Sequence, residues 1–150
     1  MTKKALKLCF DAHRDQLDKS GMPYVFHPFH LAEQMDNEDA VILALLHDVV
    51  EDTPTTPEDL RQMGFSERVL EALALLTHDD AVPYMDYVAA IARDPLAKQV
   101  KLADLRHNSD LTRLDAVDEW ALARQKKYLS AIALLENEPL KAPTSIDAIS

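Results

Sequence analysis

The chain has 150 residues, of which 47% are hydrophobic and 28% charged, as expected for one globular domain with a substantial core. The formal net charge of −10 argues against a general nucleic-acid-binding protein, because no basic stripe appears in the sequence. Cys9 is the single cysteine, so an intrachain disulfide is excluded. No stretch resembles a signal peptide or a membrane span, and we expect a cytoplasmic protein with no membrane partner.

Two glycines and many alanines and leucines favour helices over a sheet. In chain order, the predicted helices span residues 3–19, 29–35, 38–52, 57–63, 67–77, 84–93, 95–109 and 116–136. Ser20-Gly21 is expected to end the first helix, and Asn37 is expected to cap the third. The last helix is expected to bury one stripe, formed by Leu122, Leu129, Ile132 and Ala133. The expected architecture is one all-α domain over residues 1–137, followed by a weakly ordered tail over residues 138–150.

The third predicted helix contains an unbroken apolar run from Ala40 to Leu46, which leaves no polar face to turn toward water. The next turn places His47 and Asp48 in line with that buried interior. An isolated carboxylate in such a place costs several kcal/mol, so something positive is expected to meet Asp48. An arginine, a lysine or a metal ion would satisfy this requirement.

Two further acidic residues follow at helical spacing. Glu51 lies four residues after His47, and Asp52 lies four residues after Asp48. Three carboxylates and an imidazole so close together repel one another unless a cation lies among them. The alternative is that Glu51 and Asp52 simply point outward from the end of a helix. Because the burial argument for Asp48 is independent of this spacing, we favour the metal site.

Other metal ligands must come from elsewhere in the chain. His27 lies in a predicted loop of aromatic residues, where Pro28 restricts its backbone, although a hydrogen-bonded core histidine is the common outcome there. Asp104 stands between apolar residues of a predicted helix, so it repeats the anomaly of Asp48. Neither residue alone is a strong signal for a metal site.

Taken together, these motifs resemble the HD superfamily of metal-dependent phosphohydrolases, and they look closest to its alarmone (ppGpp) hydrolase branch, which includes the RelA/SpoT hydrolase domains and the small stand-alone enzymes. The resemblance covers roughly residues 5–115. The matching motifs are Ala12-His13 with Gln16, Ser20-Gly21, Pro23-Tyr24, His27-Pro28, the run from Leu46 to Thr53, Lys101 to Asp104, and His107-Asn108. The His-Asp-x-x-Glu-Asp block combined with the other motifs is highly specific.

The resemblance implies a compact helical bundle with a metal site in its core, whose four ligands would be His27, His47, Asp48 and Asp104. Manganese is the usual ion of the family, and two imidazoles with two carboxylates also suit Fe²⁺. The resemblance further implies a catalytic acidic pair, Glu51 and Asp52, and nucleotide contacts by Lys19 and Asn108. The implied chemistry is attack by a metal-activated water on a nucleotide phosphate ester, with one carboxylate serving as its base.

Lys101 lies one turn before Asp104 and would bind a substrate phosphate, although a solvated surface lysine is an equally ordinary outcome. One position departs from the resemblance. Alarmone hydrolases typically have an arginine against the guanine base, and Asp18 stands there in this sequence. An acidic residue cannot provide the cation–π contact, and it repels phosphate.

The sequence therefore predicts a metal-dependent phosphohydrolase similar to (p)ppGpp 3′-pyrophosphohydrolases, acting on a nucleotide or another phosphorylated small molecule. A monomer and a homo-oligomer are both compatible with the sequence. Hydrolysis of a different phosphorylated metabolite is the first alternative, because Asp18 alters the base pocket. A catalytically silent metal- or nucleotide-binding protein is the second, although it has no need of both Glu51 and Asp52. A helical interaction module without metal leaves Asp48 and Asp104 unexplained.

Overall fold

A computed structural model describes the backbone of residues 1–147 and the side chains of residues 1–137. The described residues form helices and no strand, apart from one isolated bridge between Leu17 and Pro23. This confirms the predicted all-α class. The helices are α1 (Thr2–His13), α2 (Phe26–Glu33), α3 (Glu38–Leu46), α4 (Val49–Asp52), α5 (Pro57–Gln62), α6 (Glu67–Leu76), α7 (Tyr84–Ile91), α8 (Pro95–Asn108), the short 3-10 helix η1 (Leu111–Arg113) and α9 (Glu119–Asp147).

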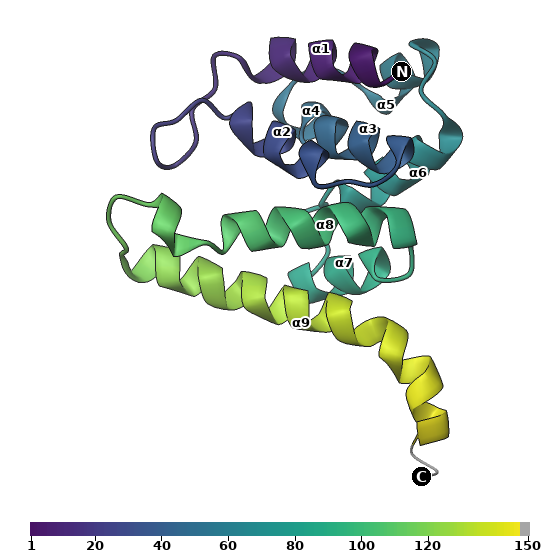
Figure 1. Ribbon diagram of the computed structural model, residues 1–150, viewed down its shortest axis with the longest axis vertical. Helices are drawn as coiled ribbons and strands as arrows, with labels where there is room; N and C mark the ends of the chain where they lie inside the picture. Colours follow the sequence, from purple (N-terminus) through teal and green to yellow (C-terminus); the bar gives the residue numbers. More distant parts are fainter. Residues whose placement is uncertain (148–150) are drawn as a thin grey trace.

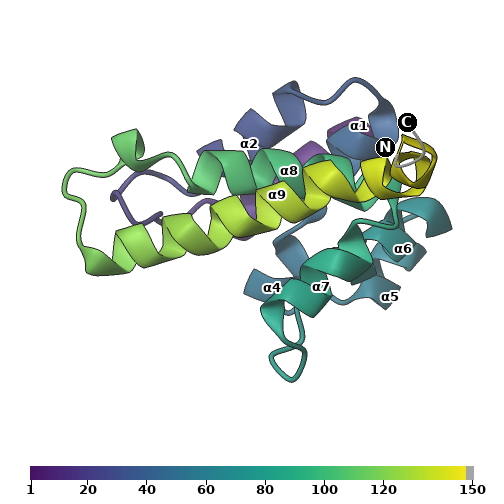
Figure 2. The same cartoon turned by 90° about the horizontal axis from the view of Figure 1, so that it is seen from below.

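Helix α3 is the centre of the bundle, as its apolar sequence predicts. It packs against α1, α2, α6 and α8, and every residue from Ile42 to Leu46 is buried. Helix α8 packs against α3 on one side and against α9 on the other, so that α9 forms an outer layer along α8 (Figures 1 and 2). Burial of apolar surface on all sides of α3 is the main force that holds these layers together.

Helix ends follow local capping chemistry where the sequence provides it. The side chain of Asn37 accepts a hydrogen bond from the Ala40 amide at 2.9 Å, which confirms the predicted cap of α3. Thr56 and Asp59 form a reciprocal capping box at the start of α5, with Pro57 at the first helical position. Within the described residues, no helix is both long and apolar enough to cross a lipid bilayer.

Three predicted helices near the site differ from the structure in their bounds. The first helix ends at His13 and not at residue 19, and residues 14–25 form a loop that we call the strap. The reason is a competing set of bonds, in which the Asp18 carboxylate accepts from the amides of Ser20 and Met22. The third helix is interrupted at His47 and Asp48 before α4 continues. Helix α2 begins at Phe26, so His27 lies in its first turn, where a following proline is tolerated.

The predicted buried stripe of the last helix was wrong at Leu122, Leu129 and Ala133, which are exposed, whereas Ile132 is half-buried and packs against the core. Leu122 is 52% exposed and Leu129 is 50% exposed. The buried positions are Ala121, Ala131 and Leu135, because α9 turns this face toward α7 and α8. The helix starts at Glu119, where the Asp118 carboxylate accepts from the Ala121 amide, and it continues past residue 136 to Asp147. Residues 148–150 of the predicted tail lie outside the described residues.

Candidate metal centre and nucleotide cleft

Three buried side chains converge between α2, the end of α3 and α8. One donor atom from each of His27, His47 and Asp104 lies within 4.8 Å of the others, and all three residues are buried. His27 Nε2 is 2.8 Å from Asp104 Oδ1, and His47 Nε2 is 3.7 Å from the same oxygen. Residues 77 positions apart in the sequence thus meet around one point. Two imidazole nitrogens and a carboxylate oxygen form a donor set suited to a first-row divalent metal ion.

The hydrogen bonding of His47 shows what this point requires. Its Nδ1 is 2.7 Å from the carbonyl oxygen of Ala44, which can only accept, so Nδ1 carries the proton. Nε2 is buried with no hydrogen-bond partner among the described residues, and it faces Asp48 Oδ2 at 3.1 Å. Burial would lower the pKa of His47, but the charges of Asp48 and Asp104 outweigh it and raise this pKa well above its ordinary value. The geometry therefore demands positive charge at Nε2, from a proton or a metal ion.

His107 contacts His27 through the ring nitrogen that does not face Asp104. The two Nδ1 atoms are 2.6 Å apart and the rings stack with centroids 4.9 Å apart. Burial and the neighbouring His27 lower the pKa of His107 to about 4, so His107 is neutral. The Asp104 carboxylate only accepts, so His27 Nε2 donates to its Oδ1 at 2.8 Å. With a metal ion on Nε2, His27 would instead carry its proton on Nδ1, and His107 would accept it. Metal-binding histidines are commonly fixed in this way by an outer partner.

Asp48, the fourth predicted ligand, lies beside His47 but outside this mutually close trio. The hydroxyl of Tyr24, from the strap, donates a hydrogen bond to its Oδ2. Burial would raise the pKa of Asp48, but His47 outweighs this effect and lowers it to about 2, so the carboxylate is charged. Its Oδ2 lies 3.1 Å from His47 Nε2, but its oxygens are not within 4.8 Å of all the donor atoms of the other three residues.

Asp104 shares its charge between two neighbours. Lys101 Nζ donates to Oδ2 at 3.1 Å, and Asn108 Nδ2 donates to Oδ1 at 3.0 Å. The Lys101 side chain is only 14% exposed and lies 5.3 Å from the ring centre of Tyr87, so it is no solvated surface lysine. We call His27, His47 and Asp104 the metal trio. Lys101 and Asn108, both predicted to bind substrate, thus contact its Asp104.

The predicted acidic pair divides between two sides of the centre. Glu51 Oε1 accepts a hydrogen bond from the His78 amide at 3.0 Å, and partial burial raises the pKa of Glu51. Asp52 turns toward the strap, where Gln16 Nε2 donates to its Oδ2 at 3.3 Å. Both carboxylates belong to exposed residues, which suits groups that must reach water or a substrate.

Two cavities open onto the trio. A cavity of about 390 Å³, here the strap cleft, lies between the strap, η1 and α9, and His27, Tyr24 and Asn108 line its inner end. A cavity of about 160 Å³, here the tyrosine cleft, contains His47, Asp48, Glu51, Asp104 and Lys101. Asn108 and Tyr128 line both cavities, so the two cavities are neighbours.

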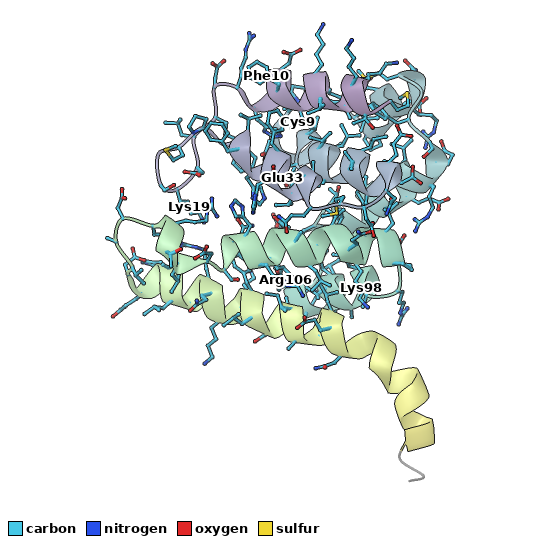
Figure 3. The ribbon with its side chains drawn as sticks, viewed as in Figure 1. Cys9, Phe10, Lys19, Glu33, Lys98 and Arg106 are labelled. Atoms are coloured by element: carbon cyan, nitrogen blue, oxygen red, sulfur yellow. The ribbon has the colours of Figure 1, made fainter. Side chains whose placement is uncertain are left out.

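The strap cleft contains the predicted Lys19 and two arginines, Arg113 and Arg124, that sequence reasoning missed. Its charged lining residues are Asp18, Lys19, Asp110, Arg113 and Arg124. Figure 3 places Lys19 on the side of the strap that faces the start of α9. Arg113 donates to the carbonyl oxygen of His107 at 2.9 Å and to Asp18 Oδ2 at 3.4 Å. The acidic residue at position 18 therefore holds a cation from the opposite wall. No local sequence signal could have paired residues 95 positions apart.

Comparisons with known proteins agree with this geometry, although no protein-family model matches the chain. The guanosine-3′,5′-bis(diphosphate) 3′-pyrophosphohydrolase of Aquifex aeolicus is 32% identical over 147 residues, covering 89% of this chain and 20% of that protein. The chain thus spans about a fifth of the length of that relative. The enzyme of the same name MESH1 of Homo sapiens is 35% identical over 130 residues, covering 77% of this chain and 72% of that protein.

A solved structure of a metazoan ortholog of SpoT, which hydrolyses ppGpp and plays a role in starvation responses, has the same fold. The TM-score is 0.71 at 24% identity, covering 89% of this chain and 84% of that chain. At this identity the likeness establishes the fold alone. The sequence identity to the human protein, over most of both chains, establishes the family. The chain belongs to the HD-type family of guanosine-3′,5′-bis(diphosphate) 3′-pyrophosphohydrolases.

Proposed function

We propose that the chain is a metal-dependent (p)ppGpp 3′-pyrophosphohydrolase, with His27, His47, Asp48 and Asp104 as the metal ligands. The observation that carries the proposal is the buried, unpartnered Nε2 of His47, which faces carboxylate oxygens of two aspartates. A divalent cation bound there would polarise a phosphoryl oxygen and make a water molecule easier to deprotonate. Mn²⁺ is the ion that we propose, and the mixed imidazole and carboxylate donors suit it.

The two cavities support a nucleotide that lies across the centre. The nucleoside would occupy the strap cleft beside Lys19, Arg113 and Asn108. The 3′-pyrophosphate would enter the tyrosine cleft, where Lys101 and Lys127 provide positive charge. The ester bond would then lie beside Asn108 and Tyr128, which line both cavities. This arrangement places the lysines of the tyrosine cleft next to the 3′-pyrophosphate.

The acidic pair supplies the proton transfers of the proposed reaction. Glu51 lies in the tyrosine cleft, where its raised pKa suits a group that takes a proton from the attacking water. Asp52, on the strap side, would accept or return a proton at the nucleoside end. The bond that breaks joins the ribose 3′ oxygen to the first phosphorus, and water supplies the new oxygen on the released pyrophosphate.

A substrate panel tests the proposal. The protein with Mn²⁺ is incubated with ppGpp, pppGpp, NTPs, dNTPs and 3′-phosphonucleotides, and the release of phosphate or pyrophosphate is followed. We expect pyrophosphate from ppGpp and pppGpp. Turnover of a different phosphorylated compound alone would favour hydrolysis of another phosphorylated metabolite, which Asp18 in the lining of the strap cleft supports. Tight metal binding without any turnover would instead indicate a silent binding protein.

A further inference from the structure

A buried histidine at the end of α1 lies behind the proposed active site. His13 is fully buried, and its ring packs against that of Tyr24 with centroids 4.9 Å apart. Its Nδ1 is 2.9 Å from Gln16 Oε1, whereas Nε2 is buried without a hydrogen-bond partner among the described residues. An apolar side chain would fill the same space without burying an unpartnered nitrogen. Packing alone therefore does not account for a histidine at this position.

The hydrogen bonds determine which atoms donate and which accept between His13, Gln16 and Asp52. The Asp52 carboxylate only accepts hydrogen bonds, so Gln16 must present its amide nitrogen to Asp52 Oδ2, at 3.3 Å. The amide oxygen of Gln16 then faces His13, and His13 Nδ1 must carry a proton to donate to it. Reversing the Gln16 amide would place its oxygen against the carboxylate. The group therefore has one consistent arrangement, which runs from His13 through Gln16 to Asp52.

Gln16, the middle residue of this hydrogen-bonded group, has a fixed backbone. Its backbone N–H donates to the His13 carbonyl oxygen at 3.0 Å, and its backbone carbonyl oxygen accepts from the Tyr24 backbone N–H at 2.8 Å. With its backbone fixed, the Gln16 side chain has little freedom to turn away from Asp52. Oδ2 of Asp52 is engaged in this way, while Oδ1 has no side-chain partner among the described residues and stays available.

We propose that His13 is a positioning residue, which acts through Gln16 to hold the Asp52 carboxylate in its reactive orientation. This inference rests on the role proposed above for Asp52. His13 does not line either cavity, so it does not touch the substrate. Gln16 does line the strap cleft, and it transmits the constraint from the core to the cleft.

Two amide substitutions of nearly equal size separate positioning from packing. In His13→Asn the amide nitrogen replaces Nδ1 and keeps the donor to Gln16, whereas in His13→Gln it replaces Nε2 and the donor is lost. We expect His13→Asn to retain most of kcat, and His13→Gln and His13→Leu to lose about tenfold in kcat with unchanged KM and metal content. Equal kcat in the Asn and Gln variants would overturn the proposal. If the His13 variants do not fold, Gln16→Leu, at a half-buried position of the strap, is expected to give the same loss of kcat.

A second background shows whether the effect passes through Asp52. On an Asp52→Asn background, His13→Leu is expected to cause no further loss of kcat. A further tenfold loss there would show that His13 acts on the fold or on another group.

Nuclear magnetic resonance gives a readout that needs no turnover. The imidazole ¹⁵N signals of His13 are expected to report a proton on Nδ1, and a proton on Nε2 alone would overturn the inference. The ¹³Cγ signal of Asp52 is expected to shift in His13→Leu but not in His13→Asn. If these results hold and ppGpp is not hydrolysed, the proposed function fails while the positioning of Asp52 stands. If ppGpp is hydrolysed and the Asp52 signal is unchanged in both variants, the positioning alone fails.

Discussion

The metal trio and the strap cleft lie next to each other, but they differ in burial and in the structural elements that form them. His27, His47 and Asp104 are buried, with side chains 3–9% exposed, and they sit on helices packed against the core. The strap cleft has walls of loop and 3-10 helix, and its Arg113 side chain is 29% exposed. Buried donors with fixed partners are pre-organised for a cation, whereas partly solvated charges on loops can adapt to a ligand. Substitutions in the trio should therefore abolish chemistry, and those in the cleft should weaken binding.

The largest expected effect is in the trio. Asp104→Asn removes the charge that holds Lys101 and faces both histidines, so we expect metal affinity and ppGpp turnover to fall by more than about 100-fold. Bound manganese measured by mass spectrometry, together with pyrophosphate release, checks this result. Asp39→Asn, an exposed acid in the first turn of α3, is the control and should retain both properties. Normal metal content in the Asp104 variant would separate this residue from the metal site.

Glu51→Gln tests the step after metal binding. The amide keeps the size of the side chain but cannot take a proton, so we expect kcat to fall by about 100-fold or more with metal content unchanged. Single-turnover kinetics and metal analysis provide the measurement. Glu71→Gln, on the exposed side of α6, should behave as the native protein. Full activity of the Glu51 variant would exclude this carboxylate from the proposed reaction.

His107→Phe tests a residue that contacts the trio but belongs neither to it nor to the lining of the strap cleft. The ring would still stack on His27 but could not accept the Nδ1 proton that His27 would carry with a metal ion on Nε2. We expect manganese affinity to fall by about 10- to 100-fold, with activity restored at saturating metal. Titration of activity against Mn²⁺ measures this directly. The neighbouring Arg106→Ala, which removes an exposed ion pair with Glu136, should leave the titration unchanged.

A smaller effect is expected in the strap cleft. Arg113→Ala removes a pocket cation held by Asp18, so KM for ppGpp should rise about tenfold while kcat stays near the native value. Steady-state kinetics separate the two parameters. Arg93→Ala, an exposed arginine outside both cavities, is the matched control. A large loss of kcat with native KM would mean that the two regions are not functionally distinct.

The smallest effect is expected behind the trio, at Cys9, which points into the interior while Phe10 points outward (Figure 3). Burial, and next the negative charge of Asp48, raise the pKa of the Cys9 thiol to about 12. At pH 8 only about one molecule in ten thousand carries the reactive thiolate. A thiol reagent should therefore leave the folded protein unmodified and react after unfolding in urea. Rapid labelling of the folded protein would show that this part of the core opens.

Local patterns in the sequence were sufficient for the core around α3, and the family resemblance named the three residues of the trio. The apolar run of α3 dictates burial whatever packs around it, and a charged residue in such a place, as at Asp48 or Asp104, requires a partner. Capping residues such as Asn37 define helix starts by contacts within one turn, so they too can be predicted locally. The assignment of Mn²⁺ and of individual ligands remains a prediction.

The tertiary structure alone decided the surroundings of the trio. The end of α1 at His13 depends on bonds within the strap, and the buried face of α9 depends on α7 and α8, which explains the failure at Leu122 and Leu129. The pairing of Arg113 with Asp18, and of His107 with His27, joins residues 95 and 80 positions apart. Such contacts arise from how helices pack and not from any local periodicity. The sequence by itself determined which groups cannot stay alone in the interior, and only the fold decided which partners reach them.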